Sequence, residues 1–212
     1  MRARLFALAA AALLAGCATP GKDLLARSRQ ALAAAPVCCA SLATAKRTAL
    51  PVQPQPAEVL IGDKSQAFDF GGNKAFFVLY ELPRFSQPYS IVLTSVGAGT
   101  LQDTALLIPR VATYDAGFRV LRYFDEKTLR NRGNDLERTV FVNPSDAQER
   151  YLAIYGSDLS SSIERAYSMV TVTPVTVGMG TWNFYSGADG KCVLRSSPAG
   201  KLLVEVKGLD AR

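Results

Sequence analysis

Histidine is absent from all 212 residues of the chain. This absence excludes Ser-His-Asp and Cys-His nucleophile systems and the usual histidine-containing zinc sites. It also removes the side chain that most often transfers protons near neutral pH. The sequence further lacks the Gly-x-Ser-x-Gly and Ser-x-x-Lys patterns of hydrolases and penicillin-binding proteins, a glycine-rich phosphate loop and an EF-hand loop. We therefore expect a non-catalytic chain with no metal and no cofactor.

One class of enzyme survives these exclusions. A glycosidase needs only two carboxylates at a suitable separation, and the chain has 18 acidic residues. Surface charges and turn formers are the simpler interpretation of those residues. A deep cleft holding two acids would be needed to favour catalysis.

Long apolar runs are also scarce, and the single candidate lies at the N-terminus. A basic start, Met1–Arg4, precedes about ten apolar residues at 5–14, too few to cross a bilayer core that needs about 20. This order is typical of an export signal. It ends in Leu-Ala-Gly-Cys17, which resembles the lipobox of bacterial lipoproteins. The alternative is an ordinary signal peptide that happens to end near a cysteine.

The lipobox predicts cleavage of residues 1–16 and acylation of Cys17, and two or more acyl chains give stable anchoring. Ala18, rather than Asp, follows the cysteine. By resemblance to the usual sorting rule, this favours the outer membrane, with the folded part facing the periplasm. No cluster of four or more Lys or Arg is present, which together with the compartment argues against a nucleic-acid partner.

Three further cysteines, Cys38, Cys39 and Cys192, would lie in an oxidising compartment. One of the adjacent pair could bridge to Cys192 and tie the N-terminal segment to the end of the domain. Such a bridge leaves one thiol over. We regard a bond between the two neighbours as the less favourable pairing. The remaining alternative is three small buried apolar residues.

The chain divides into three parts. After the signal, residues 17–56 form a lipidated tether with a short helix, favoured by Ala, Leu, Arg and Gln and ended by Pro36. The tether closes with the proline-rich spacer 51–56, which favours an extended backbone. Residues 57–212 form the main domain.

The main domain shows the pattern of a β-protein. Short runs rich in Val, Ile, Tyr, Phe and Thr alternate with turn residues every 8 to 15 positions or so. We expect strands at 57–61, 66–70, 75–82, 89–95, 105–114, 118–124, 138–143, 150–155, 170–177 and 201–207. Gly71-Gly72-Asn73 predicts a hairpin turn, and the capping-box pattern Ser161-x-x-Glu164 predicts a helix at 162–168. The expected fold is an antiparallel, jelly-roll-like β-sandwich.

Binding chemistry is concentrated in one segment. Trp182-Asn183-Phe184-Tyr185 places three aromatic rings beside an amide, and aromatic platforms with polar neighbours are suited to sugar rings. We take Trp182, Asn183 and Tyr185 as candidate ligand-binding residues. The competing interpretation, which we favour, makes Trp182 and Phe184 core residues of a strand.

A set of short motifs occurs along the chain: Pro36-Val-Cys-Cys39 with Ser41-Leu42, Phe68-Asp-Phe70 with Gly71–Lys74, Phe76–Pro83, Leu107-Ile-Pro109, Tyr114-Asp115 with Phe118 and Arg122, Arg138–Asn143 and Arg150–Tyr155. With these motifs the chain resembles the maltose operon periplasmic protein family, over roughly residues 36–156 and more weakly over 157–207. The resemblance implies a periplasmic, non-enzymatic, β-rich protein linked to maltose or maltodextrin uptake, and it brings no catalytic residues. The lipobox is a departure from that family. The strand-and-turn pattern also looks like the bacterial pre-peptidase C-terminal sandwich, a binding or stabilising module.

Together these observations predict a lipid-anchored accessory binding protein of the envelope. Its ligand would be an oligosaccharide of maltodextrin type. The alternative is an interaction or scaffolding module that docks another envelope protein and takes no sugar.

Overall fold

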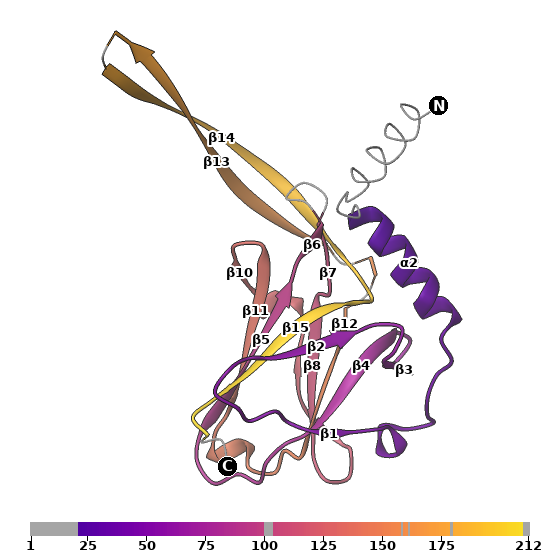
Figure 1. The fold of residues 1–212 in the computed structure, drawn as a ribbon. Helices are drawn as coiled ribbons and strands as arrows, with labels where there is room; N and C mark the ends of the chain where they lie inside the picture. The colour runs from indigo at the N-terminus through magenta and orange to yellow at the C-terminus, as the bar shows by residue number, and fades with distance from the viewer. Residues whose placement is uncertain (1–20, 100–103, 158, 161, 179, 210–212) are drawn as a thin grey trace, which may run out of the picture.

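The computed structural model describes residues 21–99, 104–157, 159–160, 162–178 and 180–209. Two sheets face each other and a third extends away from them (Figure 1). The mainly β, sandwich-like architecture confirms the expected fold class. Residues 1–20, including the predicted signal and Cys17, lie outside the described part.

The first sheet has the order β1-β4-β12-β8-β9, with β3 also paired to β4. Its strands are β1 (Thr48–Ala49), β3 (Gln66–Asp69), β4 (Lys74–Glu81), β8 (Pro109–Tyr114), β9 (Val120–Phe124) and β12 (Tyr151–Gly156). The turn between β3 and β4 has positive φ at Gly71 and Gly72, and the Phe70 amide donates to the Asn73 carbonyl at 3.0 Å. Glycine tolerates both angles without strain, so the predicted hairpin is confirmed.

The second sheet has the order β10-β11-β5-β15-β2. Its strands are β2 (Ala57–Ile61), β5 (Tyr89–Val96), β10 (Arg130–Arg132), β11 (Asp135–Val142) and β15 (Gly200–Lys207). The central strand β5 pairs antiparallel with both β11 and β15. The proline-rich spacer follows β1 in the first sheet and leads to β2 in the second, so it is the crossing between the two layers.

The core lies between these two sheets. Phe76, Leu152 and Ile154 from the first sheet meet Ile91 and Leu93 from the second, all of them fully buried. A second apolar cluster covers the opposite face of the first sheet, where Phe77, Leu79 and Tyr155 pack under the N-terminal segment. Strand β4 is therefore buried on both faces, which explains its nearly continuous apolar sequence.

The N-terminal segment packs on the sandwich. Helix α2 (Gly21–Ala34) buries Leu25 and Leu32, and Leu50 also enters the core. Three short 3-10 turns, η1 (Leu42–Thr44), η2 (Glu126–Thr128) and η3 (Pro144–Asp146), complete the secondary structure of the described residues. Residue 57 therefore marks a change in amino-acid composition, but Leu32 and Leu50 before it pack in the same core as the strands after it.

The third sheet has the order β13-β14-β7-β6, with β6 (Ala98–Gly99) and β7 (Thr104–Leu106) at its base. Its long strands, β13 (Ser162–Val177) and β14 (Gly180–Ser196), form a hairpin that projects from the sandwich (Figure 1). The helix predicted at 162–168 is wrong, because Ser162 to Ser168 pair residue by residue with Arg195 to Asp189. A complete partner strand outweighs a local capping signal.

Candidate functional site

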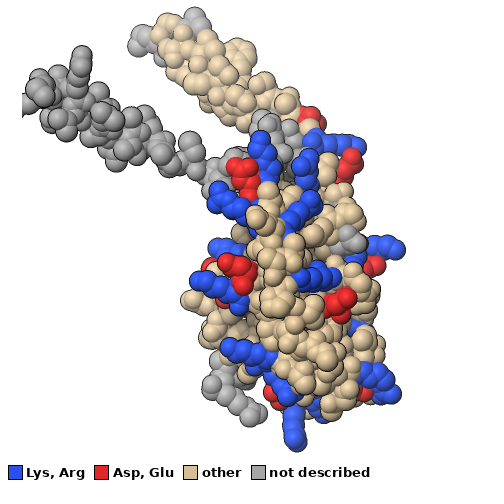
Figure 2. Space-filling view, turned by 90° about the vertical axis from the view of Figure 1, so that its right-hand side faces the viewer, with Lys and Arg blue, Asp and Glu red and all other residues tan. Residues whose placement is uncertain are grey.

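The projecting part of the β13–β14 hairpin, residues 166–188, is the most unusual surface of this protein, and we refer to it as the arm. No charged residue occurs between Ala166 and Ala188. In the space-filling view the described part of the arm is tan almost to its base, whereas blue and red side chains are scattered over the sandwich (Figure 2). An uncharged surface with exposed large side chains such as Val170, Trp182 and Phe184 is characteristic of a binding site.

Three aromatic residues of the arm are exposed to solvent. Trp182 is 68% exposed, Phe184 61% and Tyr185 71%, and Val170 and Val172 on the partner strand are also exposed. The favoured interpretation, in which Trp182 and Phe184 belong to the core, is therefore wrong. A core position requires a second sheet or a helix packed against the strand, and within the described part of the chain nothing packs against the arm.

The three candidate ligand-binding residues do not converge on one site. Side chains alternate between the two faces of a strand, so Trp182 shares a face with Phe184, and Asn183 shares the opposite face with Tyr185. Trp182, Asn183 and Tyr185 lie on β14, where their partners on β13 are Val175, Pro174 and Val172, in that order. The arm thus presents two uncharged faces that both carry an aromatic side chain, and the three candidates do not form one sugar-binding site.

The base of the arm is firmly held. Leu194 is fully buried in a cluster with Leu106, Ile108 and Leu136, against which Ile163 packs. Strand β14 also pairs in parallel with β7 through Arg195 and Ser196. The hairpin is therefore anchored to the sandwich at its base.

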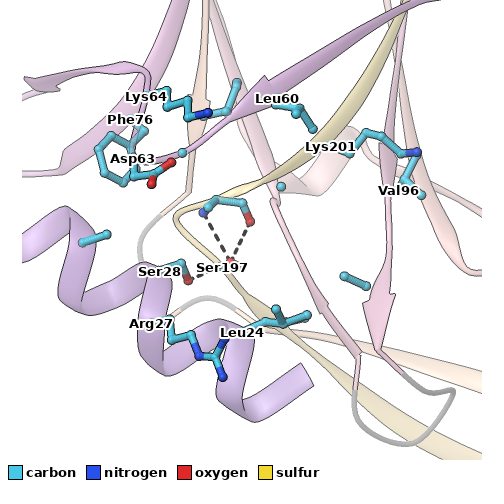
Figure 3. A pocket seen from close by; sticks show the side chains of 17 residues that line it. Leu24, Arg27, Ser28, Leu60, Asp63, Lys64, Phe76, Val96, Ser197 and Lys201 are labelled. Atoms are coloured by element: carbon cyan, nitrogen blue, oxygen red, sulfur yellow. Dashed lines mark hydrogen bonds between the residues drawn. The ribbon is translucent and has the colours of Figure 1, made fainter. Parts of the chain in front are cut away.

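The second feature is a groove of about 540 Å³ between α2 and the second sheet (Figure 3). Its walls carry small or apolar side chains, and its polar lining includes one carboxylate, Asp63. The groove therefore does not supply the carboxylate pair that a glycosidase requires.

The cysteine pairing differs from the expected one. Cys38 and Cys39 are joined to each other, so the predicted bridge from this pair to Cys192 is wrong. The Cys38 amide donates to the Ala67 carbonyl at 2.8 Å beside β3, and Cys39 packs against the outer cluster of the first sheet. Cys192 lies on β14, opposite Arg165 in the third sheet.

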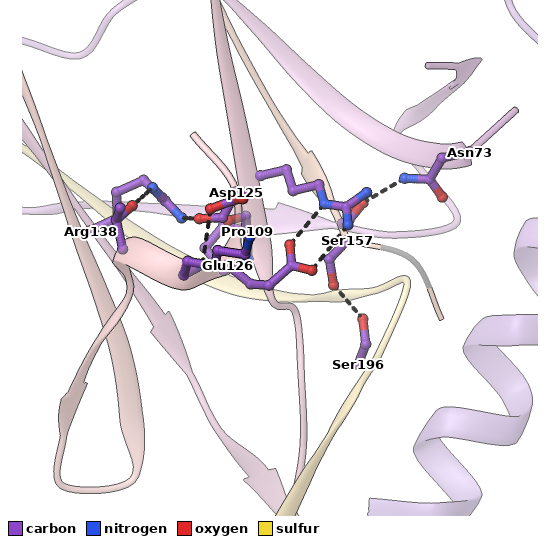
Figure 4. Close-up of polar contacts among 11 residues, drawn as sticks. Asn73, Pro109, Asp125, Glu126, Arg138, Ser157 and Ser196 are labelled. Atoms are coloured by element: carbon purple, nitrogen blue, oxygen red, sulfur yellow. Dashed lines mark hydrogen bonds and ion pairs between the residues drawn. The ribbon is translucent and has the colours of Figure 1, made fainter. Parts of the chain in front are cut away.

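Buried polar groups elsewhere are engaged in structural contacts. The Glu149 carboxylate accepts from Arg122 Nε at 2.6 Å and Nη2 at 2.8 Å, and from Thr113 Oγ1 at 2.6 Å. Arg138 is only 2% exposed and donates to the Asp125 carbonyl and the Thr128 hydroxyl (Figure 4). Burial lowers the pKa of the Arg138 guanidinium. These contacts hold strands β8, β9 and β11 against neighbouring loops and turns.

No group of three or more potential metal ligands occurs among the residues that the structure describes. Within the same residues, no helix combines the length and apolar character needed to cross a bilayer. Comparison with known proteins finds no matching family model, no matching curated protein and no matching solved structure.

Proposed function

We propose that this protein is a non-catalytic envelope lipoprotein, anchored in the outer membrane through Cys17, whose arm docks a protein partner on the periplasmic side. The observation that carries the proposal is the arm itself, 23 uncharged residues with exposed aromatic rings on both faces. Tyr and Trp dominate the energetics of protein interfaces because they bury large areas at low entropic cost.

The strand edges of the arm are suited to pairing with a strand of another polypeptide. A two-stranded ribbon is marginally stable in water by itself. Apart from the two residues of β14 that pair with β7, neither outer edge pairs with another described strand. Unpaired edges accept added strands readily. Bare lipid is a poorer occupant, because open strand edges are not tolerated in hydrocarbon.

The position of the lipid anchor supports a partner at the membrane. Cys17 precedes the first helical residue, Gly21, by four positions, and four residues span at most about 14 Å. Helix α2 begins at the end of the sandwich from which the arm leaves (Figure 1), and Ser28 lies within 3.2 Å of the Ser197 hydroxyl just beyond β14. An acylated Cys17 would thus bring the arm close to the bilayer surface.

The test is site-specific photo-crosslinking in the native host, using the full chain. A photoreactive amino acid replaces Phe184 or Tyr185 in the arm, and Phe141, an exposed aromatic residue of β11, provides the matched control. We expect a discrete adduct with one envelope protein from the arm positions and none from position 141. The absence of an adduct from both arm positions would refute the proposal, and so would adducts formed only between copies of this chain.

A maltodextrin ligand is the second candidate, supported by the exposed indole of Trp182 and the family resemblance. The chain has one tryptophan, so its fluorescence reports directly on the arm. Titration with maltooligosaccharides should quench or shift that fluorescence if sugar stacks on the ring. An unchanged spectrum at millimolar sugar would eliminate this candidate and leave the docking proposal standing.

A further inference from the structure

The groove beneath α2 has space because the residues on its walls are small. Ala31 faces it from the helix, and Ala98, Ala105, Ala199 and Gly200 face it from the strands and the loop before β15. Between the buried Leu25 and Leu32, α2 turns Ser28 towards the groove, and the Ser28 hydroxyl donates to the Leu25 carbonyl. Helix and sheet therefore meet without large interlocking side chains, and a volume remains between them.

The lining also includes larger apolar side chains, which suit a hydrocarbon chain. They are Leu24, Leu60 and Val96, with the buried residues Ile61 and Phe76 behind them. Ligand pockets of about 300–1,000 Å³ with mostly apolar walls and few polar groups are typical small-molecule sites, and this groove is within that range. A sugar, which needs many hydrogen-bonding partners, does not fit such walls.

The charges at the groove determine the sign of the head group. Arg27, Lys64 and Lys201 line it together with one acid, Asp63 (Figure 3). Lys201 pairs with Glu58 at 3.3 Å, whereas neither Arg27 nor Lys64 has an ion pair within the described part of the chain. The lining thus carries two more positive than negative charges, which complements an anion.

We propose that this groove binds a long-chain fatty acid, with its hydrocarbon tail between α2 and the second sheet and its carboxylate at the cationic rim beside Lys64. The apolar lining accounts for the tail and the excess positive charge accounts for the head group. The inference is independent of the docking role of the arm, because the two sites share no residue.

The test uses envelope membranes that contain the full chain and a dodecanoic acid with a terminal diazirine. After irradiation, mass spectrometry should locate the label in groove-lining segments, at Leu24–Ala31 or Leu60–Lys64. Unlabelled fatty acids should compete about two- to fourfold more strongly for each added CH₂ until the groove is filled. Dodecyltrimethylammonium, which has the same tail and the opposite charge, should not compete.

Matched variants separate the groove from the general surface. Ala31→Phe fills it from the helix and should reduce labelling at least tenfold, whereas Ala26→Phe, on an exposed position of the same helix, should not. Ala98→Phe fills the groove from β6 and replaces the first variant if that one does not accumulate. Lys64→Glu should weaken competition by dodecanoate about two- to fivefold, and Lys127→Glu on η2 should leave it unchanged.

Three results would overturn the inference. These are label spread over the sandwich or confined to the arm, equal competition by the cationic amphiphile, and wild-type labelling of both filled variants. Loss of labelling in an arm variant, Phe184→Thr, would likewise assign the binding to the arm. Because crosslinking of the arm to its protein partner is measured separately, failure of one proposal does not imply failure of the other.

Discussion

The ion pair between Arg122 and Glu149 yields a prediction about stability that depends on which partner is removed. The Glu149 side chain is 1% exposed, and that of Arg122 is 28% exposed. Arg122→Met would leave a carboxylate buried without its counter-charge, which typically costs about 3–5 kcal/mol. Removing the more exposed partner should therefore be the more damaging change.

The reciprocal substitution should cost less. Glu149→Leu leaves Arg122 partly in water and still 3.4 Å from Asp146. Its main penalty is the buried Thr113 hydroxyl, which loses its acceptor at a cost of about 1–2 kcal/mol. In the double variant no carboxylate remains to be stranded, so we expect it to be clearly more stable than Arg122→Met alone.

Urea unfolding followed by circular dichroism measures these differences. A shift in midpoint at constant slope reports a change in stability and not in the extent of unfolding. The reasoning is refuted if Glu149→Leu destabilises as much as Arg122→Met, or if the two penalties simply add in the double variant.

Three further predictions concern the core, the arm and a buried cation. Burial raises the pKa of Tyr80 and Tyr114 to about 12. Because the folded state favours the neutral phenol, the free energy of unfolding should be constant up to about pH 10, the ordinary tyrosine pKa, and should fall towards pH 12. An unfolding midpoint that stays level to pH 12 would contradict this prediction. Leu194→Ala at the buried base of the arm should lower the free energy of unfolding by about 2–5 kcal/mol, whereas Phe184→Thr on the exposed arm should lower it by about 1 kcal/mol or less. Equal shifts in the thermal melting temperature would show that the arm is packed in solution. Arg138→Met removes a buried guanidinium but leaves the Asp125 carbonyl and the Thr128 hydroxyl without their donor. It should therefore cost about 1–3 kcal/mol, and an unchanged midpoint in urea unfolding would show that these hydrogen bonds contribute nothing net.

Strands whose two faces alternate or are both buried could be located from the sequence. Ala57–Ile61 is bounded as expected, and Gln66–Asp69, Lys74–Glu81 and Gly200–Lys207 differ from the expected strands by about one residue. Local chemistry was sufficient because β-branched and aromatic residues stand between strong turn formers. The turn at Gly71-Gly72 was equally local, since it needs only two positive φ angles.

Most of the third sheet could not be predicted in this way: the expected strand 170–177 covers only the second half of β13, and no strand was expected where β14 lies. Glycines at 187 and 190 within β14 look like turn residues, yet they lie in a strand because β13 supplies a partner at every position. The same pairing overrides the helix signal at 162–168. Likewise, a large aromatic residue such as Trp182 is expected in a core. It lies on the surface because no other layer packs against it in the described structure.

The sequence alone determined the elements that depend on neighbouring residues: the sheet-forming segments, the hairpin turn, the short helix ended by Pro36, and the lipobox as a prediction about the unseen N-terminus. Tertiary structure decided what depends on residues far apart in the chain. It joined Cys38 to Cys39, placed α2 over a groove of small side chains, and left an uncharged hairpin that no other described segment covers. The physical reason is that burial and pairing belong to surfaces formed by several segments, and a single segment does not specify what will face it.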